Sequence, residues 1–372
     1  MSYIPKKYTH VQLIAYQTPT FFMTKDNAPP AIFSLPPQLN TLQHKDEKSR
    51  VTRMYMVTLF AAGQKHVDKS ERTLKLFAAP EFYFKTATPS TDYSKSGSPG
   101  KYGAYSFNVM QNILACLKAV FTSSAALSLG TLNHWMIVPG TIVSEIPWNS
   151  KQYKDVNTYL NTAPVIKAGE PDAPFHFVQK HYVSHIDGPP MSRGLFSKNT
   201  PFAATLAKLK EKGLDDDEAR LFQMDNIAFG MEVCLDHNNG VLKATFEKGQ
   251  HKNRPDIHLV VSCGMKLVDE NVIARKDGFG MICDGIKPLS GVKQALKQTG
   301  ATGAQLGPYA VPSASVDIPA SLQVTPDVGA TAIFLKDGGA KWGGSKSADK
   351  LVATKDYIFP EKIVYYKPVK VK

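Results

Sequence analysis

The chain has 372 residues, and 43% of them are apolar, which is enough to bury a large hydrophobic core. Its formal charge is +12, from 44 Lys and Arg against 32 Asp and Glu, and the basic residues are dispersed along the sequence. Dispersed charge is typical of a solvated surface and gives no sign of a nucleic-acid-binding face. No apolar run approaches the ~18 residues of a membrane-spanning helix, so we expect no membrane association.

The cysteines are few and scattered, and no pair has the Cys-x-x-Cys spacing of a zinc ribbon or a redox motif. They are Cys116, Cys234, Cys263 and Cys283. So few cysteines in a long chain favour a reduced, cytoplasmic protein. The N-terminal residues lack the apolar segment of a secretory signal, so we expect no such leader. Delivery into another cell would leave no readable signal and stays open.

Apolar, strand-like runs alternate with helix-like segments through most of the chain, which favours an α/β fold with a mixed or parallel sheet. Strands are expected at 10–17, 74–79, 135–143, 158–166, 227–233, 257–262 and 363–366, and helices at 39–67, 106–129 and 200–212. Segments 86–103 and 190–222 are irregular inserts, and the pattern weakens after about residue 287. With no internal repeat and no clear linker, we expect one domain over 1–372.

Three polar residues stand at the ends of predicted strands. Glu81 follows the apolar run that ends at Pro80, Lys180 follows the strand-like run 175–179 within an alternating stretch over 175–183, and Cys234 leads into a polar turn. In α/β proteins the reacting groups collect at the carboxyl ends of strands. A carboxylate, an ammonium and a thiol in this order favour a nucleophilic cysteine with its own base and a cation that stabilises negative charge.

Each of the three residues has a plainer interpretation when it is taken alone. A free cysteine is commonly a small buried hydrophobe, and Cys263 follows a strand just as Cys234 does. Lys180 would otherwise be an edge lysine that reaches water, and Glu81 a solvated loop carboxylate. Local context therefore does not separate the two thiols.

Taken together, the three residues match the motifs of one family. A glutamate follows proline after a buried strand, a lysine precedes histidine on a strand, and a cysteine lies in a Gly-x-x-x-Cys-x-Asp turn. The motifs are Phe77-Ala-Ala-Pro-Glu81, Val178-Gln-Lys-His181 and Gly230-Met-Glu-Val-Cys-Leu-Asp236, with supporting matches at Pro139–Ile142 and Asn157–Ala163. On these residues the chain resembles the nitrilase, or carbon–nitrogen hydrolase, superfamily over about residues 8–285.

The resemblance implies a four-layer α-β-β-α sandwich with extra loop inserts and a divergent C-terminal extension at 286–372. It also implies a cysteine-dependent hydrolase of a non-peptide C–N bond, in a small amide, N-carbamoyl compound or nitrile, acting through a thioester acyl-enzyme. Glu81 would be the base, Cys234 the nucleophile, and Lys180 with the backbone N–H of Leu235 the oxyanion stabilisers. No metal or cofactor is implied, and a homodimer is expected.

The chain departs from the family pattern in its second carboxylate. Many members carry another glutamate shortly after the lysine, and here Asp187 and Glu232 are the candidates. Tyr83, His181 and His237 are candidates for the lining of the pocket.

Other functions stay open at this point. The superfamily includes acyl transferases, which pass the acyl group to an amine. A binding or scaffold protein that keeps the fold without turnover would be consistent with the basic surface and the long inserts. A Cys–His dyad formed with His181 or His185 is a further alternative.

Overall fold

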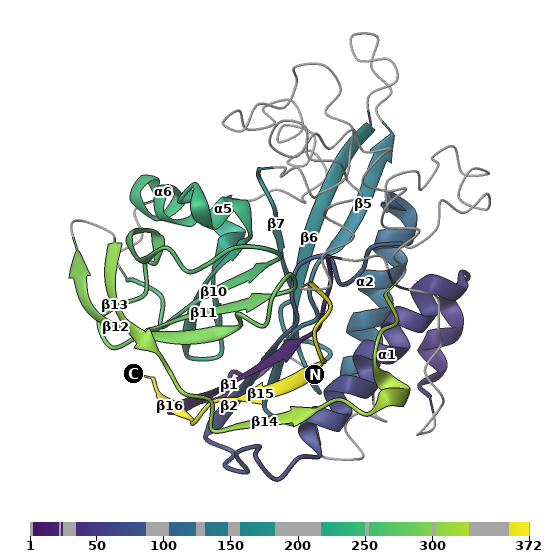
Figure 1. The fold of residues 1–372 in the computed structure, drawn as a ribbon, viewed down its shortest axis with the longest axis horizontal. Coiled ribbons are helices and arrows are strands. Elements are labelled where there is room, and N and C mark those ends of the chain that lie inside the picture. The colour runs from purple at the N-terminus through teal and green to yellow at the C-terminus, as the bar shows by residue number, and fades with distance from the viewer. Residues whose placement is uncertain are drawn as a thin grey trace.

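The structure is a computed structural model of the chain. It describes residues 3–21, 24, 35–86, 104–123, 131–147, 157–182, 217–249, 253–299, 303–326 and 357–371. Two sheets pack face to face, with helices on the outer side of each (Figure 1). Among the described residues, no helix is both long and apolar enough to cross a bilayer.

The first sheet contains ten strands within the described residues. Its order is β14 (Ala314–Asp317), β15 (Lys362–Tyr365), β1 (His10–Gln17), β2 (Thr73–Ala78), β4 (Trp135–Val138), β6 (Asn157–Lys167), β5 (Ile142–Pro147) and β3 (Tyr105–Ser106), with β16 (Val369–Lys370) paired to β1 and β7 (His176–Gln179) paired to β6. Strands β1, β2 and β4 are parallel, and β6 runs antiparallel to β4, β5 and β7. Both faces of β1 and β2 are covered, which explains their nearly continuous apolar sequence.

The second sheet contains six strands in the same described part of the chain. Its order is β13 (Gly303–Tyr309), β12 (Gly291–Thr299), β11 (Phe279–Asp284), β10 (Ile257–Ser262), β9 (Ile227–Val233) and β8 (Leu221–Met224). Strands β9, β10 and β11 are parallel, so their carboxyl ends meet at one edge of the sheet. The segments that follow them carry Cys234 and Cys263.

The main core lies between the two sheets. Leu13 and Leu76 from the first sheet pack in one buried cluster with Met231 and Leu259 from the second. Burial of each such side chain contributes about 1.5–3 kcal/mol to stability. These contacts fix the two sheets against each other and so fix the strand ends that carry the polar residues.

Helices cover the outer face of each sheet. On the first sheet, α1 (Lys45–Ala62) and α2 (Phe107–Thr122) pack on residues such as Phe77 and Ile137. On the second, α5 (Leu235–Asn238) and α6 (Val241–Lys248) lie beside β9, and a Cβ at Gly230 would come within 2.7 Å of Leu242. The expected α-β-β-α layer order is confirmed.

Several element boundaries differ from the sequence prediction for physical reasons. Helix α1 begins at Lys45, not Leu39, because Pro36 and Pro37 start a separate 3₁₀ turn, η1 (Pro37–Thr41). Glu47 then caps the helix by accepting the backbone N–H of His44 at 2.8 Å.

The single strand expected at 135–143 is wrong. Pro139 and Gly140 divide it into β4 and β5, and Gly140 takes a φ of +87° that favours glycine. A Cβ there would overlap the carbonyl oxygen of Pro80, so this turn fits closely against the segment that leads to Glu81.

The sequence pattern missed β8 and the strands from β11 to β14. The C-terminal residues do not stand apart from the fold, since β12 and β13 extend the second sheet while β14, β15 and β16 extend the first. The helix expected at 200–212 lies outside the described residues, as does nearly all of the 86–103 insert and most of the 190–222 insert.

Candidate active site

A buried ion pair joins Glu81 to Lys180. Glu81 follows β2 and Lys180 follows β7, and Nζ of the lysine lies 2.7 Å from Oε1 of the glutamate. Asn161 on β6 donates its side-chain N–H to the same oxygen at 2.8 Å. Both charged side chains are almost fully shielded from water, where a charge is costly unless it is paired and hydrogen-bonded. Two positions 99 residues apart in sequence thus form one charged contact.

The turn after Glu81 is strained and held in place. Phe82 has a φ of 66°, and its backbone N–H donates to the side-chain oxygen of Thr141 at 2.8 Å. A positive φ at a bulky residue persists only when its surroundings enforce it. The Phe82 ring also lies 5.5 Å from Nζ of Lys180 and 4.9 Å from Nζ of Lys85. Two buried ammonium groups therefore face one ring beside Glu81.

Cys234 occupies a second strained turn, between β9 and α5. Its φ and ψ are 48° and −109°, and its backbone N–H donates to the carbonyl oxygen of Val261 at 2.9 Å. A sharp strand-to-helix turn of this type directs a nucleophile away from the sheet, and its strain costs roughly 1–3 kcal/mol. Leu235 follows as the first residue of α5.

Asp236 connects the Cys234 turn to the strand end at Lys180. Its carboxylate accepts the backbone N–H groups of the two residues after Lys180, at distances from 2.8 to 3.0 Å. Arg220 lies 3.6 Å from the same carboxylate and donates to the carbonyl oxygen of Gln179 at 2.6 Å. The segments that carry the candidate nucleophile and the candidate cation are therefore fastened to each other.

The two thiols, which local sequence context alone does not separate, have different surroundings in the structure. Cys263 is fully buried, and burial raises its pKa well above the ordinary value, with Asp284 and Glu81 raising it further. A thiol kept in its protonated form is a poor nucleophile. Cys234 has the strained turn and Cys263 lacks it, so the geometry favours Cys234.

The remaining predicted residues have distinct surroundings. Tyr83 lines a cavity with Arg50 and Arg53 of α1. His181 is buried directly after Lys180, and His237 faces Glu232 from α5. Asp187 lies outside the described residues.

Four residues around the site had no predicted role. Asn161 belongs to a segment that supported the family resemblance, so its neighbourhood was a signal for it. Asp236 ends the cysteine motif and Lys85 follows Glu81 closely, but neither position indicates a partner. Arg220 fell within an insert that carried no pattern. For these residues the sheet arrangement supplies the contacts that local sequence does not show.

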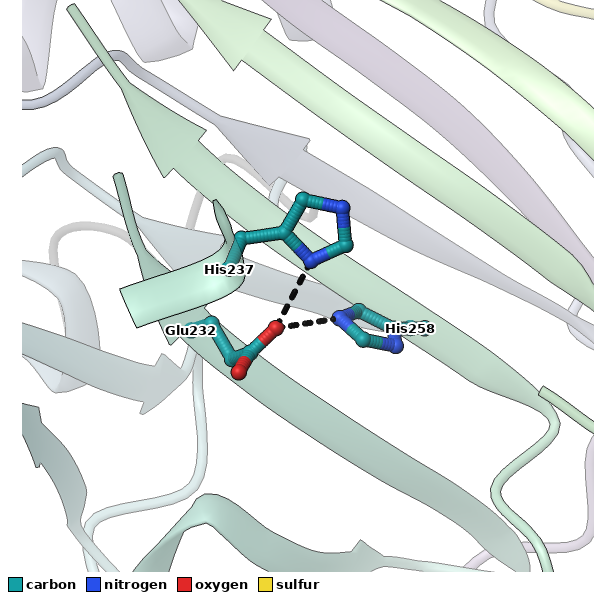
Figure 2. A group of neighbouring side chains, drawn as sticks. All are labelled: Glu232, His237 and His258. Atoms are coloured by element: carbon teal, nitrogen blue, oxygen red, sulfur yellow. Dashed lines mark hydrogen bonds and ion pairs between the residues drawn. The ribbon is translucent and has the colours of Figure 1, made fainter. Parts of the chain in front are cut away.

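One cluster in the described part of the chain has the residue types of a metal site. Glu232, His237 and His258 are fully buried, and their nearest ligand atoms lie within 4.8 Å of one another (Figure 2). The cluster lies on the opposite side of β9 from the inter-sheet core, because Met231 and Val233 point into that core and side chains alternate along a strand.

No protein-family model matches the chain, and no curated protein matches its sequence. Solved structures that resemble it include Saccharomyces cerevisiae Nit3, a member of branch 10 of the nitrilase superfamily, at 13% identity and a TM-score of 0.38 over 80% of this chain and 88% of that one. The Nesterenkonia AN1 amidase from the nitrilase superfamily, in a cysteine-to-alanine form, matches at 12% identity and a TM-score of 0.38, over 90% of this chain and 96% of that one. A carbon–nitrogen hydrolase from Helicobacter pylori G27 matches at 11% identity and a TM-score of 0.37, over 78% of this chain and 83% of that one. These three solved structures are of proteins in the nitrilase, or carbon–nitrogen hydrolase, superfamily.

Proposed function

We propose that the protein is a cysteine-dependent hydrolase of a non-peptide C–N bond in a small molecule, a member of the nitrilase superfamily. The observation that carries the proposal is the 2.7 Å contact between Glu81 and Lys180. It is supported by the strained turn at Cys234 and by the Asp236 bridge that fastens this turn beside Lys180. A buried carboxylate, ammonium and thiol at neighbouring strand ends are the groups that acyl transfer through a thiolate needs.

In the proposed reaction Glu81 accepts the thiol proton of Cys234, and the thiolate attacks the carbon of an amide, N-carbamoyl group or nitrile. Lys180 and the backbone N–H of Leu235 stabilise the negative charge that develops on the attacked group. For an amide or N-carbamoyl group, Glu81 returns its proton to the leaving nitrogen, and a thioester remains. Glu81 then takes a proton from water, which attacks the thioester; Glu81 returns this proton to the departing sulfur, so that the acid and the Cys234 thiol are released.

For a nitrile the thiolate adds to the carbon and gives a thioimidate, protonated on nitrogen by Glu81. Water then adds, ammonia leaves, and the same thioester forms. The nitrile route therefore consumes one more water molecule than the amide route, and the same three residues serve both substrate classes.

The geometry near Glu81 suits a group that exchanges a proton repeatedly. The Lys180 ammonium and the Asn161 amide both hold the same carboxylate oxygen, which fixes the side chain and stabilises its charge. Since the pair is shielded from water, the ammonium acts on developing negative charge more strongly than it would in solvent.

The test is ammonia or amine release from a panel of small amides, nitriles and N-carbamoyl compounds. Cys234→Ala and Glu81→Gln should each lower kcat by at least about 10³-fold. Cys263→Ser is the matched control for thiol loss and should keep turnover. Full activity in Cys234→Ala would refute the proposal. Product analysis with and without added amine then separates hydrolysis from acyl transfer.

The family resemblance also leads us to propose a homodimer. Light scattering coupled to size-exclusion chromatography should give twice the mass of one chain. A monomeric mass at micromolar concentration would contradict this part of the proposal.

A further inference from the structure

The cluster of Glu232, His237 and His258 connects β9 and β10 to the two helices that follow the Cys234 turn. One oxygen of Glu232 lies 2.7 Å from Nδ1 of His237 and 3.0 Å from Nε2 of His258 (Figure 2). The other oxygen accepts the backbone N–H of Leu242 at 2.5 Å. Through one carboxylate, β9 is linked to α5, to β10 and to the start of α6.

The hydrogen bonds on the far side of each ring determine where its proton lies. The backbone N–H of Val268 donates to Nε2 of His237 at 2.9 Å, and that of Ile273 donates to Nδ1 of His258 at 3.2 Å. A neutral imidazole has one donor and one acceptor nitrogen. Since a backbone N–H can only donate, both ring protons must face Glu232.

The charge of the cluster follows from these tautomers. Burial by itself would raise the pKa of Glu232, but the hydrogen bonds from His237 and His258 outweigh it and hold that pKa well below its usual range. Burial lowers the pKa of His258 more than the Glu232 carboxylate raises it. Since each ring accepts a backbone N–H at its other nitrogen, the cluster is an ionised carboxylate that accepts one N–H from each of two imidazole rings.

The same hydrogen bonds argue against a metal ion in this cluster. A metal would need the lone pairs of His237 Nδ1 and His258 Nε2, which would move both ring protons to the opposite nitrogens. Those nitrogens already face the N–H groups of Val268 and Ile273, so two buried donors would point at donors. Histidines that bind metals instead direct their second N–H at an acceptor.

The bond between Glu232 and His237 spans the Cys234 turn. Glu232 stands two residues before the cysteine and His237 three residues after it, and the N–H of His237 also donates to the carbonyl oxygen of Cys234 at 2.9 Å. Asn271 holds the same short helix by donating to the carbonyl oxygen of His237 at 2.7 Å. A strained φ at a residue other than glycine requires bracing of this kind.

We propose that Glu232 is a positioning residue, which closes the Cys234 turn through His237 and thereby aligns the thiol and the N–H of Leu235 for attack. The inference rests on the proposed function, because it assigns a role in that reaction. It also departs from the sequence-based idea that Glu232 is the second carboxylate of the site. A group that is held by three donors on the outer face of β9 acts through the turn, not on the substrate.

The test compares variants that break the bond across the turn with one that keeps it. Glu232→Gln leaves an N–H₂ group opposite a donor in either amide orientation, the ring N–H groups or the N–H of Leu242, and His237→Leu removes the bond. His237→Asn retains a donor at the Nδ1 position. We expect the first two to lower kcat by about 10- to 100-fold with KM changed less than about threefold, and His237→Asn to recover most of kcat.

Asp225→Asn is the matched control, because Asp225 lies at the other end of β9 and has a buried ion pair of its own, 2.8 Å from Lys167. It should lower the melting temperature without lowering kcat. A second readout needs no substrate, since the rate at which iodoacetamide alkylates Cys234 should fall about tenfold in Glu232→Gln and in His237→Leu. All assays are made well below each variant's melting temperature.

The outcomes separate this inference from the proposed function. If Cys234→Ala is inactive while folded Glu232→Gln and His237→Leu keep both kcat and the alkylation rate, only the positioning role is wrong. If Cys234→Ala keeps turnover, the proposed function fails, and the alkylation rates alone then decide whether Glu232 positions the thiol. If Glu232→Gln does not fold, the His237→Asn and His237→Leu pair decides. Activity that is lost in chelator and restored by zinc would contradict the metal-free, hydrogen-bonded arrangement of this cluster.

Discussion

Replacement of Gly140 by alanine should damage both stability and the Glu81 turn. Gly140 connects β4 to β5 with a φ of +87°, and an added Cβ would overlap the carbonyl oxygen of Pro80 and lie 2.8 Å from Cβ of Tyr83. The backbone conformation costs an alanine about 1–2 kcal/mol. Overpacking against backbone adds about 1–3 kcal/mol. The sum is about 2–5 kcal/mol of lost stability.

This loss should appear as a fall in melting temperature of about 4–10 °C, at about 2 °C per kcal/mol for a domain of this size. Relief of the overlap moves the Gly140 turn away from Pro80 and Tyr83, the two residues that flank the Glu81–Phe82 segment. Because a misplacement of 1 Å costs about 10²-fold in rate, we expect kcat for ammonia release to fall at least tenfold.

Gly63→Ala is the matched control. Gly63 ends α1 with a φ of −75°, and the nearest atom to an added Cβ is the carbonyl oxygen of Leu59 at 3.5 Å. This substitution should leave the melting temperature unchanged or raise it, with a gain in stability of less than about 1 kcal/mol. If Gly140→Ala and Gly63→Ala melt together and turn over equally, the proposed fit between this turn and the Glu81 segment is refuted.

The other predictions concern buried charges and thiols. Lys180→Met should destabilise the protein by about 3–5 kcal/mol near neutral pH, because it leaves the Glu81 carboxylate without its ammonium partner. In urea unfolding, the double variant with Glu81→Gln should recover much of the lost unfolding free energy. Additive losses from the two substitutions would contradict this coupling. Because burial lowers the pKa of His258, its contribution to stability is present above about pH 6.5 and is lost as pH falls, by at most about 1.4 kcal/mol per pH unit. Below pH 6.5, the unfolding free energy of His258→Gln should therefore fall less steeply with pH than that of the parent chain. Equal slopes would contradict this prediction. Burial raises the pKa of Cys116 to about 11 and of Cys283 to about 12, so at pH 7.5 iodoacetamide should modify Cys234 before either of them. Peptide mass mapping over time gives the order of modification. Earlier modification of Cys116 or Cys283 would contradict this prediction.

The strands that carry the site were predictable from local pattern. The apolar runs at 74–79 and 227–233, which lead to Glu81 and Cys234, match β2 and β9 to within one residue, because each is a short buried strand followed by polar residues. Strands β12 and β14 were missed because several of their residues are exposed and lack strong apolar character, whereas β11 is buried throughout and its short apolar run 281–283 was not recognised as a strand. A turn residue such as Gly140 shows where a strand ends, but its effect on the site depends on the backbone that packs beside it, here that of Pro80.

The sequence by itself determined which side chains stand at strand ends, Glu81, Lys180 and Cys234 among them, because strand endings are encoded by local alternation and turn residues. Only the tertiary structure decided which residues pair with these side chains. The pairing of Glu81 with Lys180, the bridge from Asp236 to the strand of Lys180, and the closed cluster at Glu232 all depend on sheet order and register. Those are set by packing between residues far apart in the chain, which no local pattern contains.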